Sequence, residues 1–209
     1  MLKNIPPVTQ GLLAANIAVF LLQMLAGNAL DPFMLWPLVS DHATGSQFLP
    51  WQVVTYGFMH GDFGHLFFNM LALFMFGAPL EYTWGTRRFA TFYFTCVVGA
   101  AITHLVLTST VGLPPLPTVG ASGGVYGLLL AYGMLFPTQR VMLLFPPIPM
   151  QARTLVIVFG ALALLMGVTG AGGNIAHFAH LGGMLFGWLL IRYWRGQPPF
   201  KPRRPRGFR

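Results

Sequence analysis

The sequence predicts an all-α integral membrane protein built as a bundle of six transmembrane helices. Of its 209 residues, 55% are hydrophobic and only 8% are charged, whereas a soluble domain carries about 25% charged residues. Six apolar runs are separated by proline, glycine or charged residues. If each run crosses the membrane once, all twelve lysines and arginines fall on one side, as the positive-inside rule requires. Five or seven crossings would place basic residues on both sides.

The six runs differ in length, and the fourth is the shortest. A helix needs about 20 residues to cross the hydrocarbon core, which is about 30 Å thick. The fourth run reaches only about 22 Å as a helix, so we expect this short helix to start inside the bilayer. The runs are Val8–Ala26, His65–Tyr82, Phe89–Val111, Ser122–Phe136, Thr154–Thr169 and Ile175–Tyr193.

The first connection, from Gly27 to Gly64, is long, rich in aromatic residues, and free of lysine and arginine. Connections of this length usually carry structure or function. Trp36 and Trp51 favour the interface between membrane and water. We therefore expect a first loop that is partly immersed in the outer half of the membrane.

The ends of the chain predict its orientation. The N-terminal residues lack the features of a removable signal peptide, so we keep them in the mature protein. Residues 1–194 are expected to form one domain, and residues 195–209 a basic, proline-rich tail without a fold. The positive-inside rule places both termini in the cytoplasm, and six helices without a seventh favour a bacterial plasma membrane. Contact with anionic lipid accounts for the +8 charge without nucleic acid; the oligomeric state is left open.

Polar residues in the runs are candidates for function, because ionisable groups at membrane depth are costly. His65 and Asn69 lie four residues apart and share one helix face. His177 and His180 lie on one side of the last run, and Ser122 opens the fourth. If that short run reaches the cytoplasmic side, the segment before it descends into the bilayer, where irregular backbone requires protein cover or water. We expect a water-accessible pit with Ser122 and free helix N–H groups at its floor.

Two further histidines are interpreted more plainly. His60 is placed in the loop or at the entrance of the second helix, and His104 is expected to reach the interface from the end of the third. A zinc site formed by these histidines would require H-E-x-x-H, but the only glutamate, Glu81, is remote from every histidine. We therefore expect no metal and no cofactor.

Several readings stay open from residues alone. Ser122 is also a suitable helix cap or packing residue, and His65 and Asn69 also suit polar contacts between helices. G-x-S-x-G matches the hydrolase elbow, but no strand precedes it and no acid is near. Small residues let membrane helices approach closely enough for a Ser122–His180 hydrogen bond. The glycines at these two places are Gly120, Gly123, Gly124 and Gly127 around the serine, and Gly183 and Gly187 after the histidine.

The motifs together resemble the rhomboid family of intramembrane serine proteases. They are "GASGGVYG" at the serine, "HGDFGHLFFN" in the second run, "GAPLEYTWGTRRF" after it and "AHLGGMLFG" in the last run. The resemblance covers nearly all of Val8 to Tyr193. One departure is that Trp36 is followed by Pro37, where many relatives have arginine. The resemblance therefore does not predict how the first loop is anchored.

The resemblance implies roles for the matching residues. Ser122 is the nucleophile and His180 the base, chosen over His177 because only His180 has glycines three and seven residues later. His177 is interpreted as a packing or supporting residue, together with His60, Gly183 and Gly187. The remaining implied roles are an oxyanion site with His65, Asn69 and the Ser122 N–H, near Gly120, and support of His180 by Tyr126.

The implied activity is hydrolysis of a peptide bond in or near the transmembrane helix of a single-pass membrane protein. Such a substrate would arrive laterally, beside the second and fifth helices. The alternative is a catalytically inactive rhomboid-like protein that binds membrane clients. Inactive relatives typically lack the serine or the histidine, and both are present in this chain.

Overall fold

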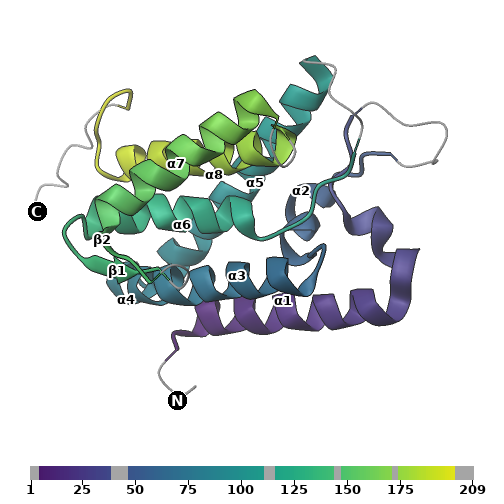
Figure 1. The fold of residues 1–209 in the computed structure, drawn as a ribbon, viewed down its shortest axis with the longest axis horizontal. Coiled ribbons are helices and arrows are strands. Elements are labelled where there is room, and N and C mark those ends of the chain that lie inside the picture. Colours follow the sequence, from purple (N-terminus) through teal and green to yellow (C-terminus); the bar gives the residue numbers. More distant parts are fainter. Residues whose placement is uncertain (1–4, 39–46, 111–115, 144–146, 171–173, 201–209) are drawn as a thin grey trace, which may run out of the picture.

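The chain folds as a bundle of helices that run roughly along a common direction (Figure 1). The computed structural model describes residues 5–38, 47–110, 116–143, 147–170 and 174–200, and side chains from residue 177 onward in the last helix. The long helices are α1 (Pro7–Ala26), α3 (Phe63–Ala72) continued by η4 (Leu73–Gly77) and α4 (Ala78–Trp84), α5 (Thr86–Thr110), α6 (Ser122–Leu135), α7 (Ala152–Thr169) and α8 (Asn174–Trp194).

The predicted all-α membrane bundle is confirmed, and each apolar run corresponds to one helical stretch within a few residues. Four helical stretches in the described residues are long and apolar enough to cross a membrane: Pro7–Phe33, Phe63–Trp84, Thr86–Thr110 and Ala152–Thr169. The helix Ser122–Leu135 is also apolar but is shorter than these four. The count of six crossings stays a prediction.

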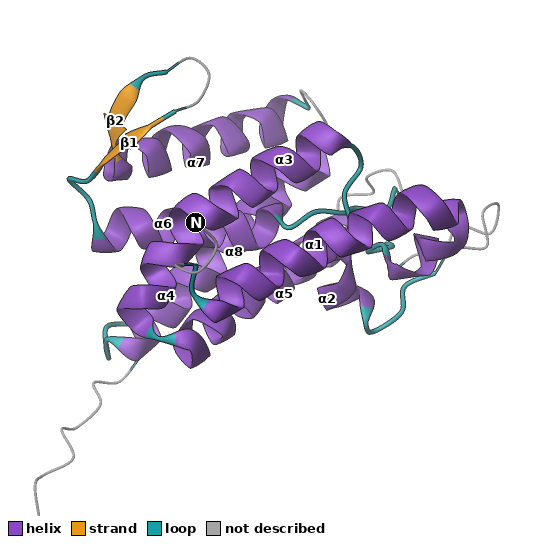
Figure 2. Cartoon of the chain, turned by 90° about the horizontal axis from the view of Figure 1, so that it is seen from below, coloured by secondary structure: helices purple, strands orange, loops and turns teal. Residues whose placement is uncertain are grey.

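The two ends of the bundle differ in structure. At one end lie α4, the end of α8 and a hairpin of β1 (Arg140–Met142) and β2 (Pro149–Gln151), paired antiparallel with Val141 opposite Met150. The opposite end carries η2 (Gly27–Phe33), α2 (Gln52–Thr55) and η3 (Tyr56–Phe58). Figure 2 shows the same separation after a quarter turn.

The second helical stretch contains a π-helical turn, which sequence periodicity does not reveal. Asp62 caps α3 by accepting a hydrogen bond from the His65 N–H at 2.8 Å. The π turn η4 shifts the helical register between α3 and α4. It carries Phe76 toward α6, where its ring meets Tyr132 edge-on.

Helix α5 is the central element of the core, and it packs against α8 and α6. Phe89, Phe92, Tyr93 and Cys96 on this helix are fully buried. Cys96 is a free cysteine and serves as a packing residue.

The first loop is held by the buried amide of Gln52 rather than by an arginine. Gln52 accepts a hydrogen bond from the Trp36 N–H and donates one to the Pro32 carbonyl. The indole N–H of Trp51 donates to the same carbonyl, and that of Trp36 donates to the Asp31 carbonyl. The loop therefore has its own internal support. Its residues 39–46 lie outside the described residues.

The start of the tail contacts α8. Arg192 Nε donates to the Pro198 carbonyl at 2.7 Å, and Phe200 lies against Tyr193. The remaining tail, 201–209, lies outside the described residues, as does Lys3.

Glu81 joins the start of α1 to α4. Its carboxylate is 2% exposed and accepts hydrogen bonds from the N–H groups of Val8 and Thr9 and from the Thr9 hydroxyl, at 2.7–3.0 Å. Unpaired N–H groups at a helix start are costly in apolar surroundings, and a carboxylate there also meets the positive end of the helix dipole. Glu81 is thus the cap of α1, supplied by another helix.

We expect Glu81→Ala to lower the free energy of unfolding by about 3 kcal/mol, because it leaves two N–H groups and a hydroxyl without a partner. Thermal unfolding in detergent, followed by circular dichroism, measures the change. Thr83→Ala on the same helix is the control, since the Thr83 hydroxyl is exposed and bonds only to Pro79. Equal stability of the two variants would contradict the capping role.

Candidate active site

The segment before α6 runs through the interior of the fold with its backbone paired. Thr118 and Leu35 exchange two backbone hydrogen bonds of 3.0 Å, and the Gly120 N–H donates to the Tyr56 carbonyl at 2.9 Å. Tyr56 in turn donates its hydroxyl to the Val97 carbonyl of α5. Irregular backbone at this depth is thus satisfied by the first loop, which explains how α6 can begin inside the bundle.

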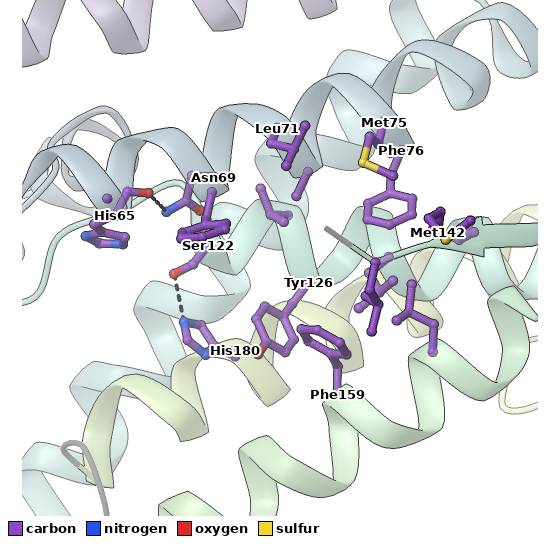
Figure 3. A pocket seen from close by; sticks show the side chains of 18 residues that line it. His65, Asn69, Leu71, Met75, Phe76, Ser122, Tyr126, Met142, Phe159 and His180 are labelled. Carbon is purple, nitrogen blue, oxygen red and sulfur yellow. Dashed lines mark hydrogen bonds between the residues drawn. The ribbon is translucent and has the colours of Figure 1, made fainter. Parts of the chain in front are cut away.

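Ser122 and His180 meet at the start of α6. Ser122 Oγ and His180 Nε2 are 2.7 Å apart and hydrogen-bonded, although 58 residues separate them in sequence. Figure 3 shows the serine on α6 pointing toward the histidine on α8. A serine hydroxyl is activated as a nucleophile when an imidazole within this distance accepts its proton.

The glycine that permits this contact lies on α8, whereas the glycines of α6 that were expected to face α8 (Gly123, Gly124 and Gly127) would place a Cβ against α5 first. A Cβ on Gly183 of α8 would overlap the Gly123 carbonyl oxygen of α6, so the two backbones touch. Gly187, the other glycine expected in this contact, lies against α5 instead: its Cβ would be 2.9 Å from Phe92 and 3.0 Å from Cys96. Close approach of α6 and α8 therefore depends on Gly183, and Gly187 serves the packing on α5.

Tyr126 is stacked on the imidazole of His180. The ring centroids are 4.3 Å apart and the planes differ by 7°. Phe159 of α7 lies on the same aromatic cluster, 6.4 Å from Tyr126. The stack fixes the plane of the imidazole and hence the direction of Nε2.

His65 and Asn69 border the same space from α3. His65 Nδ1 accepts a hydrogen bond from the Gly61 N–H at 3.4 Å, which places the ring proton on Nε2. Glycine is required at position 120 for two reasons. A Cβ there would lie 2.7 Å from this imidazole, and the φ of +128° is one that residues with a side chain rarely adopt. Asn69 donates one amide hydrogen to the His65 carbonyl and has a second free.

These groups offer hydrogen-bond donors around one point. The first N–H groups of α6 have no partner within the helix, and the Ser122 N–H is among them. Together with the Asn69 amide and His65 Nε2–H they could face a negative oxygen formed near Ser122.

The other histidines have distinct places. His60 is buried in the loop before α3, where its backbone N–H and carbonyl pair with the Gln23 amide at 3.0 and 3.2 Å. Burial, followed by the neighbouring His65, lowers the pKa of His60 to about 4, so it is neutral at pH 7. The prediction that His104 reaches the interface is wrong: this side chain is 1% exposed, because α5 lies at the centre of the bundle. His177 lies edge-on to His180, with ring centroids 5.8 Å apart.

Metal ligation has no support among the described residues, where no group of three or more His, Cys, Asp or Glu side chains could hold an ion.

An apolar cavity of about 680 Å³ leads away from Ser122 and His180 along α6. It opens between α3 and α7 and reaches the hairpin (Figure 3). Its lining residues are Gly64, His65, Phe68, Asn69, Leu71, Ala72, Met75, Phe76, Ser122, Val125, Tyr126, Leu129, Val141, Met142, Leu143, Leu155, Phe159 and His180.

Sequence reasoning missed the hairpin's part in this cavity, contributed by Val141, Met142 and Leu143. Residues 141–145 are all apolar and show no strand-like alternation, although the prolines of "FPPIP" that follow are a turn signal. It also missed Gln23 and Gln52, because an amide in an apolar chain does not reveal its partner.

Known proteins resemble this chain. The Rhomboid domain family model matches residues 47–196. Rhomboid protein 1, mitochondrial, of Saccharomyces cerevisiae is 29% identical over 92% of this chain and 58% of that protein. Rhomboid protease GlpG of Serratia proteamaculans is 30% identical over 90% of this chain and 62% of that protein. Rhomboid protease GluP of Bacillus subtilis is 27% identical over 88% of this chain and 34% of that protein. The chain thus spans less than two thirds of the length of each of these relatives.

We expect Gly183→Ala to slow the reaction of Ser122 with a fluorophosphonate by about 100-fold, because separating the helices by even an ångström misplaces the base. The measurement is the rate of covalent labelling in detergent. Gly11→Ala is the matched control, since a Cβ on Gly11 of α1 meets nothing within 4 Å. Equal labelling rates in the two variants would show that the contact at Gly183 is dispensable.

Proposed function

Because this chain belongs to the rhomboid family, we propose that it is an intramembrane serine endopeptidase with Ser122 as nucleophile and His180 as general base. The single observation that carries the proposal is the 2.7 Å hydrogen bond between these two side chains. Its place at one end of an apolar cavity that opens between two helices supports a peptide from the membrane as the substrate.

In the first step Ser122 Oγ attacks the carbonyl carbon of the scissile bond, and its proton passes to His180 Nε2. The tetrahedral oxyanion accepts hydrogen bonds from the Ser122 N–H, the Asn69 amide and His65 Nε2–H. His180 then gives its proton to the leaving nitrogen, and the C–N bond breaks to leave an acyl ester on Ser122.

In the second step a water molecule attacks the ester. His180 takes a proton from this water and returns it to Ser122 Oγ as the ester breaks. Water reaches Ser122 from the end of the bundle that carries the first loop. No metal or cofactor takes part.

The substrate is a single-pass membrane protein whose helix unwinds near the cut. It arrives from the lipid between α3 and α7, where the cavity opens, and an apolar stretch fills the cavity below Ser122. A small residue before the cut fits the crowded space at Gly120 and His65.

The chain is an integral membrane protein, as its family and its apolar helices establish. We place both termini in the cytoplasm and the protein in a bacterial plasma membrane. The arginines at the start of α5, in the hairpin and at the end of α8 support this orientation, because these elements lie at one end of the bundle.

We expect Ser122→Ala and His180→Ala each to lower cleavage of a tagged single-span substrate by at least 1,000-fold, because nucleophile and base act as one unit. The assay uses the full chain reconstituted in liposomes. Ser109→Ala on α5 is the control, since the Ser109 hydroxyl bonds only to Leu105 of its own helix, and it should cleave at the wild-type rate.

A client-binding protein without activity is the alternative. It would capture the single-span protein without cutting it, and wild type and Ser122→Ala would label equally poorly with a fluorophosphonate. Rapid labelling of wild type together with cleavage excludes this alternative.

We expect Tyr126→Leu to lower kcat about tenfold, because the stacked ring holds His180 with about 0.5–1.5 kcal/mol. Tyr126→Phe keeps the ring face and should retain most of the activity. Similar losses in both variants would assign the effect to the hydroxyl, and the stack would then have no part in catalysis.

A further inference from the structure

Among the residues that the structure describes, the second ring nitrogen of His180 has no hydrogen-bond partner. Nε2 accepts the hydrogen bond from the Ser122 hydroxyl only when the ring proton sits on Nδ1. His180 Nδ1 is buried and makes no hydrogen bond. A buried N–H without an acceptor is destabilising, and this cost would favour the tautomer that cannot activate the serine.

His177 lies where an acceptor is needed. It precedes His180 by three residues and so shares its helix face. Its ring stands edge-on to that of His180, with centroids 5.8 Å apart and planes at 78°. His177 Nε2 is also buried and makes no hydrogen bond. Two neighbouring imidazoles thus each present one unpaired nitrogen.

Other acceptors for His180 Nδ1 are committed elsewhere or wrongly placed. Of the three acidic residues described, Glu81 caps α1, Asp62 caps α3 and Asp31 lies in η2 of the first loop. Tyr126 offers only its ring face to His180, whereas an imidazole N–H points in the plane of its own ring.

We propose that His177 is a positioning residue: His177 Nε2 accepts, through one water molecule, the hydrogen bond of His180 Nδ1–H. The proposal rests on the proposed protease function. A water-mediated bond suits ring centroids 5.8 Å apart.

The link fixes the reactive tautomer of His180. Nδ1 keeps its proton throughout, and Nε2 takes the proton of Ser122 and later releases it. The lone pair on His177 Nε2 stabilises the positive charge that His180 carries during the reaction.

The test compares His177→Leu with His177→Gln in the reconstituted chain. Leu removes the acceptor, and we expect kcat to fall about tenfold with KM unchanged. Gln places an amide oxygen near the position of Nε2 and should recover most of kcat. Equal activity of wild type and the Leu variant would overturn the proposal, as would equal losses in the Leu and Gln variants.

A second measurement does not depend on cleavage. The ¹⁵N resonances of labelled imidazoles report the tautomer of each histidine, and His180→Ala assigns its signals. We expect His180 to hold its proton on Nδ1 in wild type and to shift toward Nε2 in His177→Leu. Phe178→Leu is the control, because Phe178 packs on Gly167 of α7 and not on His180; the same shift there would reduce His177 to a packing residue.

The two proposals fail differently. If wild type neither cleaves nor labels, the protease function fails, while the tautomer shift still decides the role of His177. If wild type cleaves and the tautomer of His180 is unchanged in His177→Leu, only the positioning role is lost.

Discussion

The contact between the Gly123 carbonyl and Gly183 is the constraint on which the rest of the structure depends. Backbones meet there without a side chain between them. Membrane helices associate through such close packing. Lipid tails are as apolar as the helix side chains, so the hydrophobic effect does not drive the helices together. The Ser122–His180 bond and the Tyr126 stack both lie within one turn of this point, so their short distances follow from the approach of the two backbones.

The start of α6 inside the bundle imposes a second demand, since backbone groups without partners are expensive in an apolar interior. The first loop supplies those partners through Leu35 and Tyr56. Side-chain amides in turn hold the loop in place. Gln52 donates a hydrogen bond to the Pro32 carbonyl within the loop, and Gln23 of α1 accepts one from the His60 N–H. Gln23, Gln52 and Thr55 thus each donate a hydrogen bond to a backbone carbonyl rather than to another side chain. In this way irregular segments are built into a membrane protein without exposing their N–H and C=O groups.

Features set by residues close together in the sequence were predictable, whereas features set by contacts between distant segments were not. The helices follow from apolar runs and their punctuation, which are local, and α6 begins at Ser122 as the sequence suggests. The motifs likewise identify Ser122, His180 and Tyr126 as neighbours. The helix that each glycine contacts is not determined by the local sequence. Gly183 contacts α6, whereas Gly187, one turn later, contacts α5.

Other misses have similar causes. The π turn depends on how η4 packs, and the burial of His104 depends on α5 being central rather than peripheral. The hairpin forms from two strands too short to show a period. These features depend on the crossing angles of the helices and on which helices are neighbours. Neither can be inferred from a single sequence.

A base without a carboxylate partner is consistent with these surroundings. In soluble serine hydrolases an aspartate orients the histidine, but an ion buried in an apolar interior carries a desolvation penalty of several kcal/mol. The described acids lie elsewhere: Glu81 meets the free N–H groups of α1, Asp62 meets those of α3, and Asp31 lies in η2 of the first loop. At His180 the aromatic face of Tyr126 supplies orientation by packing, which adds no charge to desolvate. Neutral partners thus set the direction of Nε2 while leaving positive charge to appear only during the reaction, where the oxyanion forms beside it and offsets it.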